Sequence, residues 1–300
     1  MKSKPKLSKR QLREERAGYL FVIPNFIGIL IFVALPIVFS LMLGFTKWNP
    51  MQGLSAIEFT GMDNFSRMLT DDRLKAALIN NLVYTLFYVP LSVCIAFITA
   101  VLLNKFVFFK VPLRLMCFMP YISAMVSVAY VWLILLNPDG GPVNSILAML
   151  GVKNLPGWFT KSNSALAGII LMSIWHDAGY YMIIFLSALQ GLSKEIYESA
   201  KVDGANGFQT FFRITVPLMA SNILFVSILA TMNSFKVFDQ INVLTEGGPG
   251  YSTNVLVYCI YHYAFREQNI GYASAVAVLL FVLIMIISVV QVKLKEKYTV

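Results

Sequence analysis

Four polar side chains, His176, Asp177, Tyr180 and Tyr181, stand close together in a long apolar stretch. Asp177 is the one charged residue between Lys161 and Lys194 in the sequence. Burying a charge or a hydrogen-bonding group away from water is costly, so such groups usually face a cavity or a partner. Aromatic rings beside hydrogen-bonding groups suit sugars, whose C–H faces stack on rings and whose hydroxyl groups need partners. The pattern indicates a site for a polyhydroxylated ligand, and contacts between neighbouring helices are the alternative.

Polar residues also interrupt two other apolar stretches. They are Ser123, Ser127 and Tyr130 in the earlier stretch, and Asn233, Ser234, Lys236 and Asp239 at the end of the later one. Near Asp177, Trp175 adds a flat ring and Gly179 a point where another segment can approach closely. These three stretches are the candidates for lining a common path.

The sequence lacks the features that catalysis would need. It contains no Gly-Lys dipeptide, which excludes a Walker A phosphate loop, so any nucleotide must be bound by a partner. His176 and His262 are far apart and have no Cys or carboxylate neighbours at ligand spacing, which argues against a metal site. No Gly-x-Ser-x-Gly elbow or paired-carboxylate arrangement favours hydrolysis. We therefore expect neither an enzyme nor a cofactor in this chain.

The composition indicates an integral membrane protein. Of the 300 residues, 58% are hydrophobic and 13% are charged, which is more apolar surface than a water-soluble domain of this length can bury. The formal charge of +9 would suggest nucleic acid for a soluble protein, but here the basic residues flank apolar runs and are typical of topology signals. Cys94, Cys117 and Cys259 are odd in number and lie in or beside apolar runs, so a packing role is expected.

Six charge-poor runs reach the roughly 20 residues that a helix needs to cross a hydrocarbon core about 30 Å thick. They are bounded by Arg16 and Lys47, Lys75 and Lys105, Arg114 and Asp139, Lys161 and Lys194, Arg213 and Lys236, and Glu267 and Lys293. The first is too long for a cleaved signal peptide and has no small-residue cleavage site. The sequence thus predicts an all-α integral membrane protein with six transmembrane helices.

The distribution of Lys and Arg predicts the orientation. With both termini in the cytoplasm, sixteen of these residues lie inside and eight outside, which follows the positive-inside rule. The expected organisation is a cytoplasmic basic segment at residues 1–17, a six-span domain at 18–292 and a cytoplasmic tail at 293–300. In this N-in, C-in arrangement, Asp63 and Gly248 lie outside.

A seventh charge-free run extends from Gly247 to Phe265. It opens with glycines and a proline, and a span there would place the basic tail outside. We therefore expect an external loop that leads into an interfacial helix. Its tyrosines, Tyr258, Tyr261 and Tyr263, suit the headgroup zone of a membrane.

The segment at residues 192–217 is too polar for a span and too patterned for a plain linker. Lys194 to Val202 are good helix formers, whereas Gly204 and Gly207 permit a sharp turn before a second short helix from Phe208 to Ile214. Pro217 is expected to begin the next span, where a missing N–H costs least. A solvated connecting loop is the plain alternative.

The residues of this segment resemble a known motif. They are Glu198, Ala200, Asp203, Gly204 and Ala205, followed by Phe211, Ile214 and Pro217. The pattern is similar to the EAA motif of binding-protein-dependent ABC importer permeases, with Ser199 where the family usually has Ala. Further segments resemble the maltose-type carbohydrate permeases: Phe59-Thr-Gly-Met-Asp-Asn-Phe65, Met119-Pro-Tyr121, Asn137-Pro-Asp-Gly-Gly141 with Asn144, and Leu244-Thr-Glu-Gly-Gly-Pro249. The last of these is more similar to the first permease of such pairs than to the second.

The resemblance implies a type I ABC importer permease fold in a bacterial inner membrane. It implies a second permease subunit, two ATPase subunits that bind ATP and Mg, an extracytoplasmic solute-binding protein and a carbohydrate substrate, with an oligosaccharide expected. The EAA loop would act as a coupling helix that docks on the ATPase. In the family, sugar contacts come from three core helices, whose matching positions here are Met125, His176, Asp177, Tyr180, Asn233, Ser234 and Val237. Because these side chains differ from the maltose pattern, maltose itself is not implied.

Two alternatives stay open at this point. One is a secondary transporter, which would need internal repeats and buried ion-coupling charges. The other is an ABC permease for glycerol-phosphate or a polyol, since related permeases share these motifs. Co-elution with an ATPase favours an ABC importer, and ion-driven uptake by the chain alone favours a secondary transporter.

Overall fold

The computed structural model describes residues 9–105 and 109–298, so parts of the predicted segments 1–17 and 293–300 lie outside the described residues. The described chain is mostly helical. The α-helices are α1 (Lys9–Ile29), α2 (Leu35–Leu43), α3 (Asp63–Met68), α4 (Asp72–Lys105), α5 (Lys110–Ile122), α6 (Met125–Leu135), α7 (Pro142–Met149), α8 (Ser162–Gln190), α9 (Lys194–Val202), α10 (Gly207–Thr210), α11 (Val216–Leu218), α12 (Ala220–Ser234), α13 (Asp239–Leu244), α14 (Leu256–Tyr261) and α15 (Ile270–Tyr298). Shorter π or 3-10 turns are η1 (Leu30–Ala34), η2 (Pro50–Gln52), η3 (Leu54–Ala56), η4 (Trp158–Thr160), η5 (Phe211–Thr215) and η6 (His262–Arg266).

Four helical segments are long and apolar enough to cross a membrane: Ala17–Leu43, α4, α8 and Ile270–Lys293. Two further segments are bent pairs, α5 with α6 at 97° and Gly207–Leu218 with α12 at 68°. The described residues thus contain four candidate spans, or six if each bent pair is one span. The apolar run between Arg114 and Asp139, expected as one span, breaks at Ser123, where the backbone is extended. Pro120 lies in the last turn before this break and has no N–H to donate.

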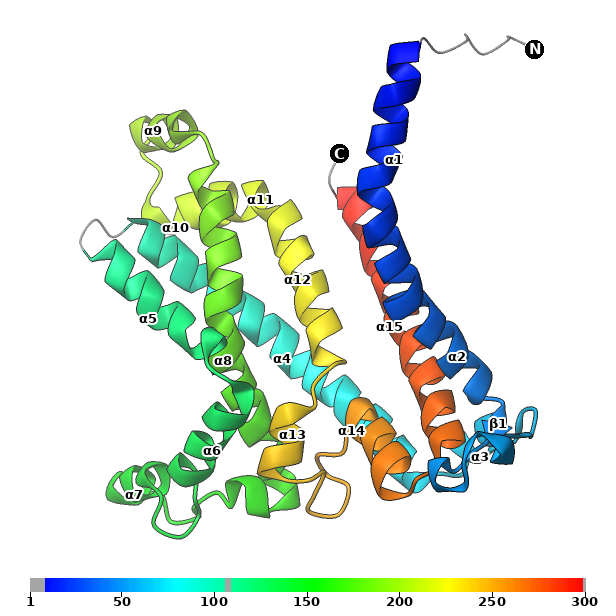
Figure 1. The fold of residues 1–300 in the computed structure, drawn as a ribbon. Coiled ribbons are helices and arrows are strands. Elements are labelled where there is room, and N and C mark those ends of the chain that lie inside the picture. The colour runs from blue at the N-terminus through cyan, green and yellow to red at the C-terminus, as the bar shows by residue number, and fades with distance from the viewer. Residues whose placement is uncertain (1–8, 106–108, 299–300) are drawn as a thin grey trace.

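Helix α8 lies at the centre of the bundle, with α4, α5 and α12 packed against it (Figure 1). The segment Ala17–Leu43 runs beside α15 at the side (Figure 1). Within the most apolar 18-residue stretch of α8, 61% of the stretch is buried inside the chain, whereas the corresponding share in Ala17–Leu43 is 6%. The outer helices therefore need lipid or another chain to cover apolar side chains such as Phe21 and Phe32.

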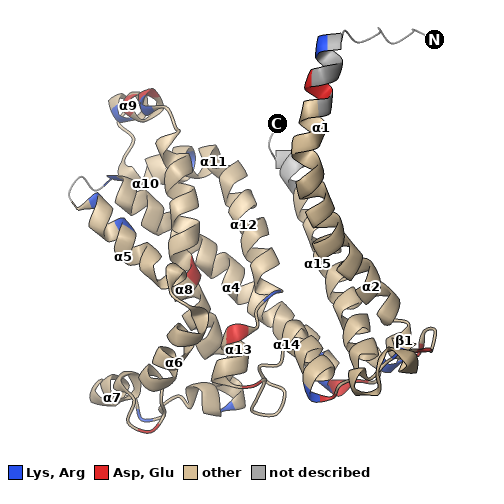
Figure 2. Cartoon of the chain, viewed as in Figure 1, with Lys and Arg blue, Asp and Glu red and all other residues tan. Residues whose placement is uncertain are grey.

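The two ends of the bundle carry different segments. The start of α1, the end of α15 and helix α9 lie at one end, whereas α3 and α7 lie at the other (Figure 1). Charged residues gather mainly at these two ends, and most of the bundle between them is uncharged (Figure 2). The acidic residue within α8 is Asp177. The charge distribution is that of a bundle whose middle lies in lipid.

Two π turns precede prolines in the long helical segments. η1 is followed by Pro36 and η5 by Pro217, each the second residue of the next helix. Because proline cannot donate the usual backbone hydrogen bond, the preceding turn can widen at low cost. The prediction that Pro217 begins the fifth span is wrong, since the helix bends after it and α12 begins at Ala220.

The charge-free run at 247–265 is not among the candidate spans, as predicted. It forms a loop, α14 and η6. The prediction that its tyrosines occupy the headgroup zone is wrong for Tyr258 and Tyr263, which are 4% and 2% exposed. Both pack inside the protein, Tyr258 against the main core cluster and Tyr263 in a second cluster with Tyr272.

A partly buried carboxylate explains why Tyr263 points inward. Asp71, just before α4, accepts hydrogen bonds of 2.7 Å from the hydroxyls of both Tyr263 and Tyr272 and one of 3.0 Å from the Leu74 N–H. Burial raises the pKa of Asp71, but these hydrogen bonds and the charge of Arg67 outweigh it and hold the pKa below its ordinary value. Asp71 thus joins the start of α4 to η6 and α15.

A short ribbon adds strands that the all-α prediction did not include. β1 (Thr46–Lys47) pairs antiparallel with β2 (Glu58–Phe59). The Asn64 side chain donates to the carbonyls of Gly44 and Thr46 at 2.9 and 2.8 Å, which fixes the ribbon beside α3. It caps the same end of the bundle as α7 and leaves the helical core unchanged (Figure 1).

Candidate functional site

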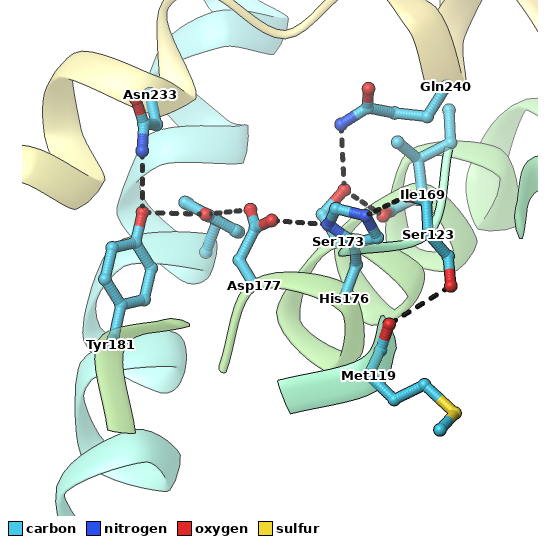
Figure 3. Close-up of polar contacts among 10 residues, drawn as sticks. Met119, Ser123, Ile169, Ser173, His176, Asp177, Tyr181, Asn233 and Gln240 are labelled. Atoms are coloured by element: carbon cyan, nitrogen blue, oxygen red, sulfur yellow. Dashed lines mark hydrogen bonds and ion pairs between the residues drawn. The ribbon is translucent and has the colours of Figure 1, made fainter. Parts of the chain in front are cut away.

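The Asp177 carboxylate lies at the centre of a polar network between three helices (Figure 3). Tyr88 of α4 donates to one carboxylate oxygen, and His176 Nδ1 lies 2.6 Å from the other. The Tyr88 hydroxyl is also 3.2 Å from that of Tyr181, which accepts from Asn233 of α12 at 3.1 Å. The network therefore joins α4, α8 and α12 through groups that can donate and accept hydrogen bonds in an apolar bundle.

Aromatic rings border the network on the side of α5. Tyr121 stacks on Tyr180 with ring centroids 4.6 Å apart, and its centroid is 5.7 Å from that of His176. The Asp177 side chain is 16% exposed and that of His176 is 7% exposed. His176 Nε2 lies 3.5 Å from the Ser123 carbonyl, at the break between α5 and α6. A partly accessible carboxylate beside stacked rings has the chemistry that a sugar hydroxyl and a C–H face require.

Gly179 is a close-approach point, as its residue type indicated. A Cβ at this position would lie 2.0 Å from the Cys117 carbonyl oxygen and 2.9 Å from Phe118 Cα in α5. The contact is therefore between helix backbones and not with a ligand. It holds α5 against α8 next to Tyr180, so that Tyr121 and Tyr180 can stack.

The structure brings only part of the predicted set of substrate contacts to open surface. Asn233 is exposed, and Met125 is half-buried against the main core cluster. Ser234 is 1% exposed, and its hydroxyl bonds to the Thr231 carbonyl and lies 2.8 Å from Thr85 Oγ1. Val237 is 5% exposed. In this conformation Ser234 and Val237 contact other helices, and a role in binding stays a prediction.

Sequence reasoning missed Tyr84 and Tyr88 of α4. Both are 1% exposed and their rings stack with centroids 5.1 Å apart. They are four residues apart and so lie on one side of the helix. Hydroxyl-bearing rings at this spacing in an apolar run were the available signal. A second missed pair is Gln240 and Ser173, joined by a hydrogen bond of 3.2 Å (Figure 3).

The segment at 192–217 forms the first predicted helix, α9, with the predicted bounds, whereas the helix predicted from Phe208 to Ile214 is α10 followed by the π turn η5. Ser193 caps α9 by accepting from the Glu195 N–H, and Asn206 forms a reciprocal capping box with Gln209 at the start of α10. Between them, Gly204 has φ +77°. A residue without a Cβ is favoured at this left-handed position.

The end of α9 is a Schellman motif. The Ala205 N–H donates to the Ala200 carbonyl at 2.9 Å, and the Gly204 N–H donates to Lys201 at 3.2 Å. Ala200 is buried, whereas Glu198, Asp203 and Gly204 are exposed. The Asp-Gly-Ala sequence thus forms a fixed turn that presents acidic side chains at its surface.

This turn protrudes from the end of the bundle (Figure 1), and apolar side chains on the helices beside it are uncovered. Val202 is 87% exposed and Phe208 is 73% exposed. The Tyr197 hydroxyl, 3.3 Å from Thr215 Oγ1, ties α9 back to η5. Exposed apolar side chains on a rigid, charged projection are typical of a surface that docks on another protein.

Comparison with known proteins decides the family. Residues 77–299 match the family described as the binding-protein-dependent transport system inner membrane component. The chain belongs to this family. This inner-membrane component is similar to the multiple sugar-binding transport system permease protein MsmF of Streptococcus mutans, with 32% identity over 97% of this chain and 99% of that one. It is also 32% identical to the lactose transport system permease protein LacF of Rhizobium radiobacter, over 91% and 92% of the two chains.

A solved structure has the same fold as this inner-membrane component. A chain from the crystal structure of a bacterial alginate ABC transporter, in complex with an alginate pentasaccharide-bound periplasmic protein, superposes with a TM-score of 0.84. The superposition covers 97% of each chain at 23% sequence identity. The resemblance predicted from the EAA loop is therefore confirmed at the level of family and fold.

Proposed function

We propose that this permease receives a carbohydrate from an extracytoplasmic solute-binding protein and passes it through a pore shared with a second permease. Two separate ATPase subunits, which bind ATP and Mg, supply the energy. The observation that carries the proposal is the projecting turn at Gly204, with its fixed Schellman geometry and exposed Val202 and Phe208. A family member without a phosphate loop needs such a docking surface to couple to an ATPase.

We further propose six spans with both termini and α9 in the cytoplasm. Counting each bent pair as one span gives six crossings, an even number. The start of α1, the end of α15 and α9 lie at the same end of the bundle, in agreement with this count (Figure 1). The excess of Lys and Arg predicted for that side supports the same orientation.

The substrate proposal rests on the site and on the relatives together. The network at Asp177 and the stacked rings of Tyr121 and Tyr180 offer hydrogen-bonding groups next to aromatic faces. Relatives that match nearly the whole chain are named for sugars. The path for the carbohydrate then runs along α8, between α4, α5 and α12.

A reconstitution experiment tests the function. The chain is purified with its partner subunits, placed in proteoliposomes and supplied with the loaded binding protein and ATP. Carbohydrate uptake should require ATP and stop when the ATPase is inactivated, with no response to an ion gradient. Uptake by the chain alone, driven by an ion gradient, would identify a secondary transporter and end the proposal.

A charge reversal tests the docking surface. Glu198→Lys should reduce copurification of the ATPase, because Glu198 is exposed on α9 and can pair with donors on a partner. Lys153→Glu, an exposed charge reversal beside α7 at the other end of the bundle, is the matched control and should retain the ATPase. Equal ATPase recovery in the two variants would contradict the assignment of α9.

A further inference from the structure

A polar cavity lies apart from the Asp177 network, where the loop after α13 meets the start of α4. Its volume is about 170 Å³, enough for several water molecules or one small polar ligand. The charged and polar residues that line it include Arg73, Glu246, Tyr251, Asn254, Tyr258, His262 and Arg266. None of these residues belongs to the network around Asp177, so the cavity is a separate site.

The loop that forms the cavity is fixed by hydrogen bonds. The Asn80 side chain donates to the carbonyls of Tyr251 and Asn254 at 2.7 and 2.9 Å. Thr253 Oγ1 donates to the Gly248 carbonyl at 2.8 Å. Glu246 has φ +49°, a left-handed conformation that non-glycine residues rarely adopt. Strained residues held by their surroundings are concentrated at functional sites, and here the strain places a carboxylate at the cavity.

The charges at the cavity do not balance. Arg266 Nη2 lies 3.8 Å from Glu246 Oε2, and both side chains are more than half exposed. Arg73 has no carboxylate within 4.0 Å among the described residues, and its guanidinium lies 5.1 Å from the centroid of the Tyr251 ring. Burial and the charge of Arg73 lower the pKa of His262, so the imidazole tends to stay neutral. The guanidinium of Arg73 is therefore left to pair with an anion.

Neighbouring acidic groups do not neutralise Arg73. Glu267 lies 3.2 Å from His262 Nδ1 and 3.9 Å from Arg67. Asp71 is occupied by Tyr263, Tyr272 and the Leu74 N–H.

The mixture of groups favours one class of ligand. A simple carboxylate would pair with Arg73 but would face the Glu246 charge and would not contact the part of the Tyr251 ring that the Arg73 guanidinium leaves open; this side chain is 45% exposed. A sugar acid has a carboxylate for Arg73, hydroxyl groups that donate to Glu246 and a C–H face for Tyr251. We propose that this cavity binds a uronic-acid unit of the carbohydrate at the entrance of the permease. The site lies outside the membrane in the proposed topology and so rests on the proposed function.

Calorimetric titration of the purified transporter complex tests the site with three probes: D-glucuronate, D-glucose and acetate. D-glucuronate should bind at least about tenfold more tightly than either of the others, because only it engages both Arg73 and Glu246. Arg73→Gln should weaken glucuronate binding by about tenfold or more. Arg266→Gln, at a more exposed position, should also weaken it. Lys75→Gln removes an exposed charge near the start of α4 and should leave binding unchanged.

Three results would overturn the assignment. If D-glucose binds as tightly as D-glucuronate, the site does not require a carboxylate on its ligand. If acetate binds as tightly as D-glucuronate, the site does not require a saccharide. Unchanged glucuronate binding in both arginine variants would place the ligand elsewhere. Each result is read from binding alone, whereas failure of the proposed function is read from the absence of ATP-driven uptake in proteoliposomes.

Discussion

The turn between α9 and α10, called the coupling turn here because we propose that it docks on the ATPase, is tested most sharply at Gly204, where the backbone conformation can be altered with little steric change. The Gly204 φ of +77° is left-handed, and a Cβ at this position would meet no atom within 4 Å. Gly204→Ala therefore isolates the backbone cost, about 1–2 kcal/mol for a residue with a Cβ. A cost of this size lowers the population of the native turn by a factor of roughly 5–30.

The expected result is a partial loss of coupling. If the ATPase docks on the native turn, Gly204→Ala should weaken docking and lower substrate-stimulated ATP hydrolysis by up to that factor. Gly204→Val should cost more, since a β-branched residue is further restricted. Gly204→Asn should cost less, because asparagine tolerates the left-handed region better. Membrane insertion and association with the external binding protein should be retained in all three.

The control is Gly207→Ala, three residues away. Gly207 also has open space around its Cβ position, but its φ is not positive, and it is the first residue of α10. ATP hydrolysis and uptake measured in reconstituted complexes should stay normal in this variant. If Gly204→Ala and Gly207→Ala behave alike, the Schellman turn does not control docking and the reasoning fails.

Three further predictions concern the bundle. Tyr88→Phe removes a hydrogen bond to a carboxylate, which is worth about 1.5–3 kcal/mol. Both Tyr88→Phe and Asp177→Ala should reduce uptake while the complex still assembles. Normal uptake in both variants would exclude the network from the substrate path. Gly179→Ala forces the backbones of α5 and α8 apart and should lower the complex's melting temperature, whereas Gly18→Ala, with open space around it, should not. Asp71 has a lowered pKa, so its stabilising contribution is full above its unfolded value of about 4 and is lost as pH falls through the lower folded value. The stability difference between the native protein and Asp71→Asn should therefore shrink below about pH 4, and a constant difference would contradict this account.

The coupling turn could be predicted because its structure depends on local chemistry. Ser193 and Asn206 are capping residues, and Gly204 supplies the left-handed position that ends α9. None of these contacts needs a distant part of the chain. The sequence therefore predicted both helices and the break between them.

Other features depend on contacts between distant segments. Tyr263 was predicted at the membrane interface because tyrosine suits that zone, but its hydroxyl binds Asp71, 192 residues earlier in the chain. The break at Ser123 was missed for a different reason, because apolar residues continue on both sides of it and the run therefore reads as one span. Pro120 was the local signal for that break.

The Asp177 network and the coupling turn are linked by the end of α8 and a short turn. Asp177 and Gln190, the last residue of α8, are 13 residues apart, which is about 20 Å along a helix, and residues 191–193 then form the turn into α9. α8 packs against α4, α5 and α12, so the short turn at residues 191–193 connects α9 to a helix held by three neighbours. The Asp177 side chain bonds to Tyr88 of α4, and Tyr181 to Asn233 of α12. Any movement of α8 relative to these two helices must break or exchange those bonds, and a sugar with several hydroxyl groups can replace the partners that are lost.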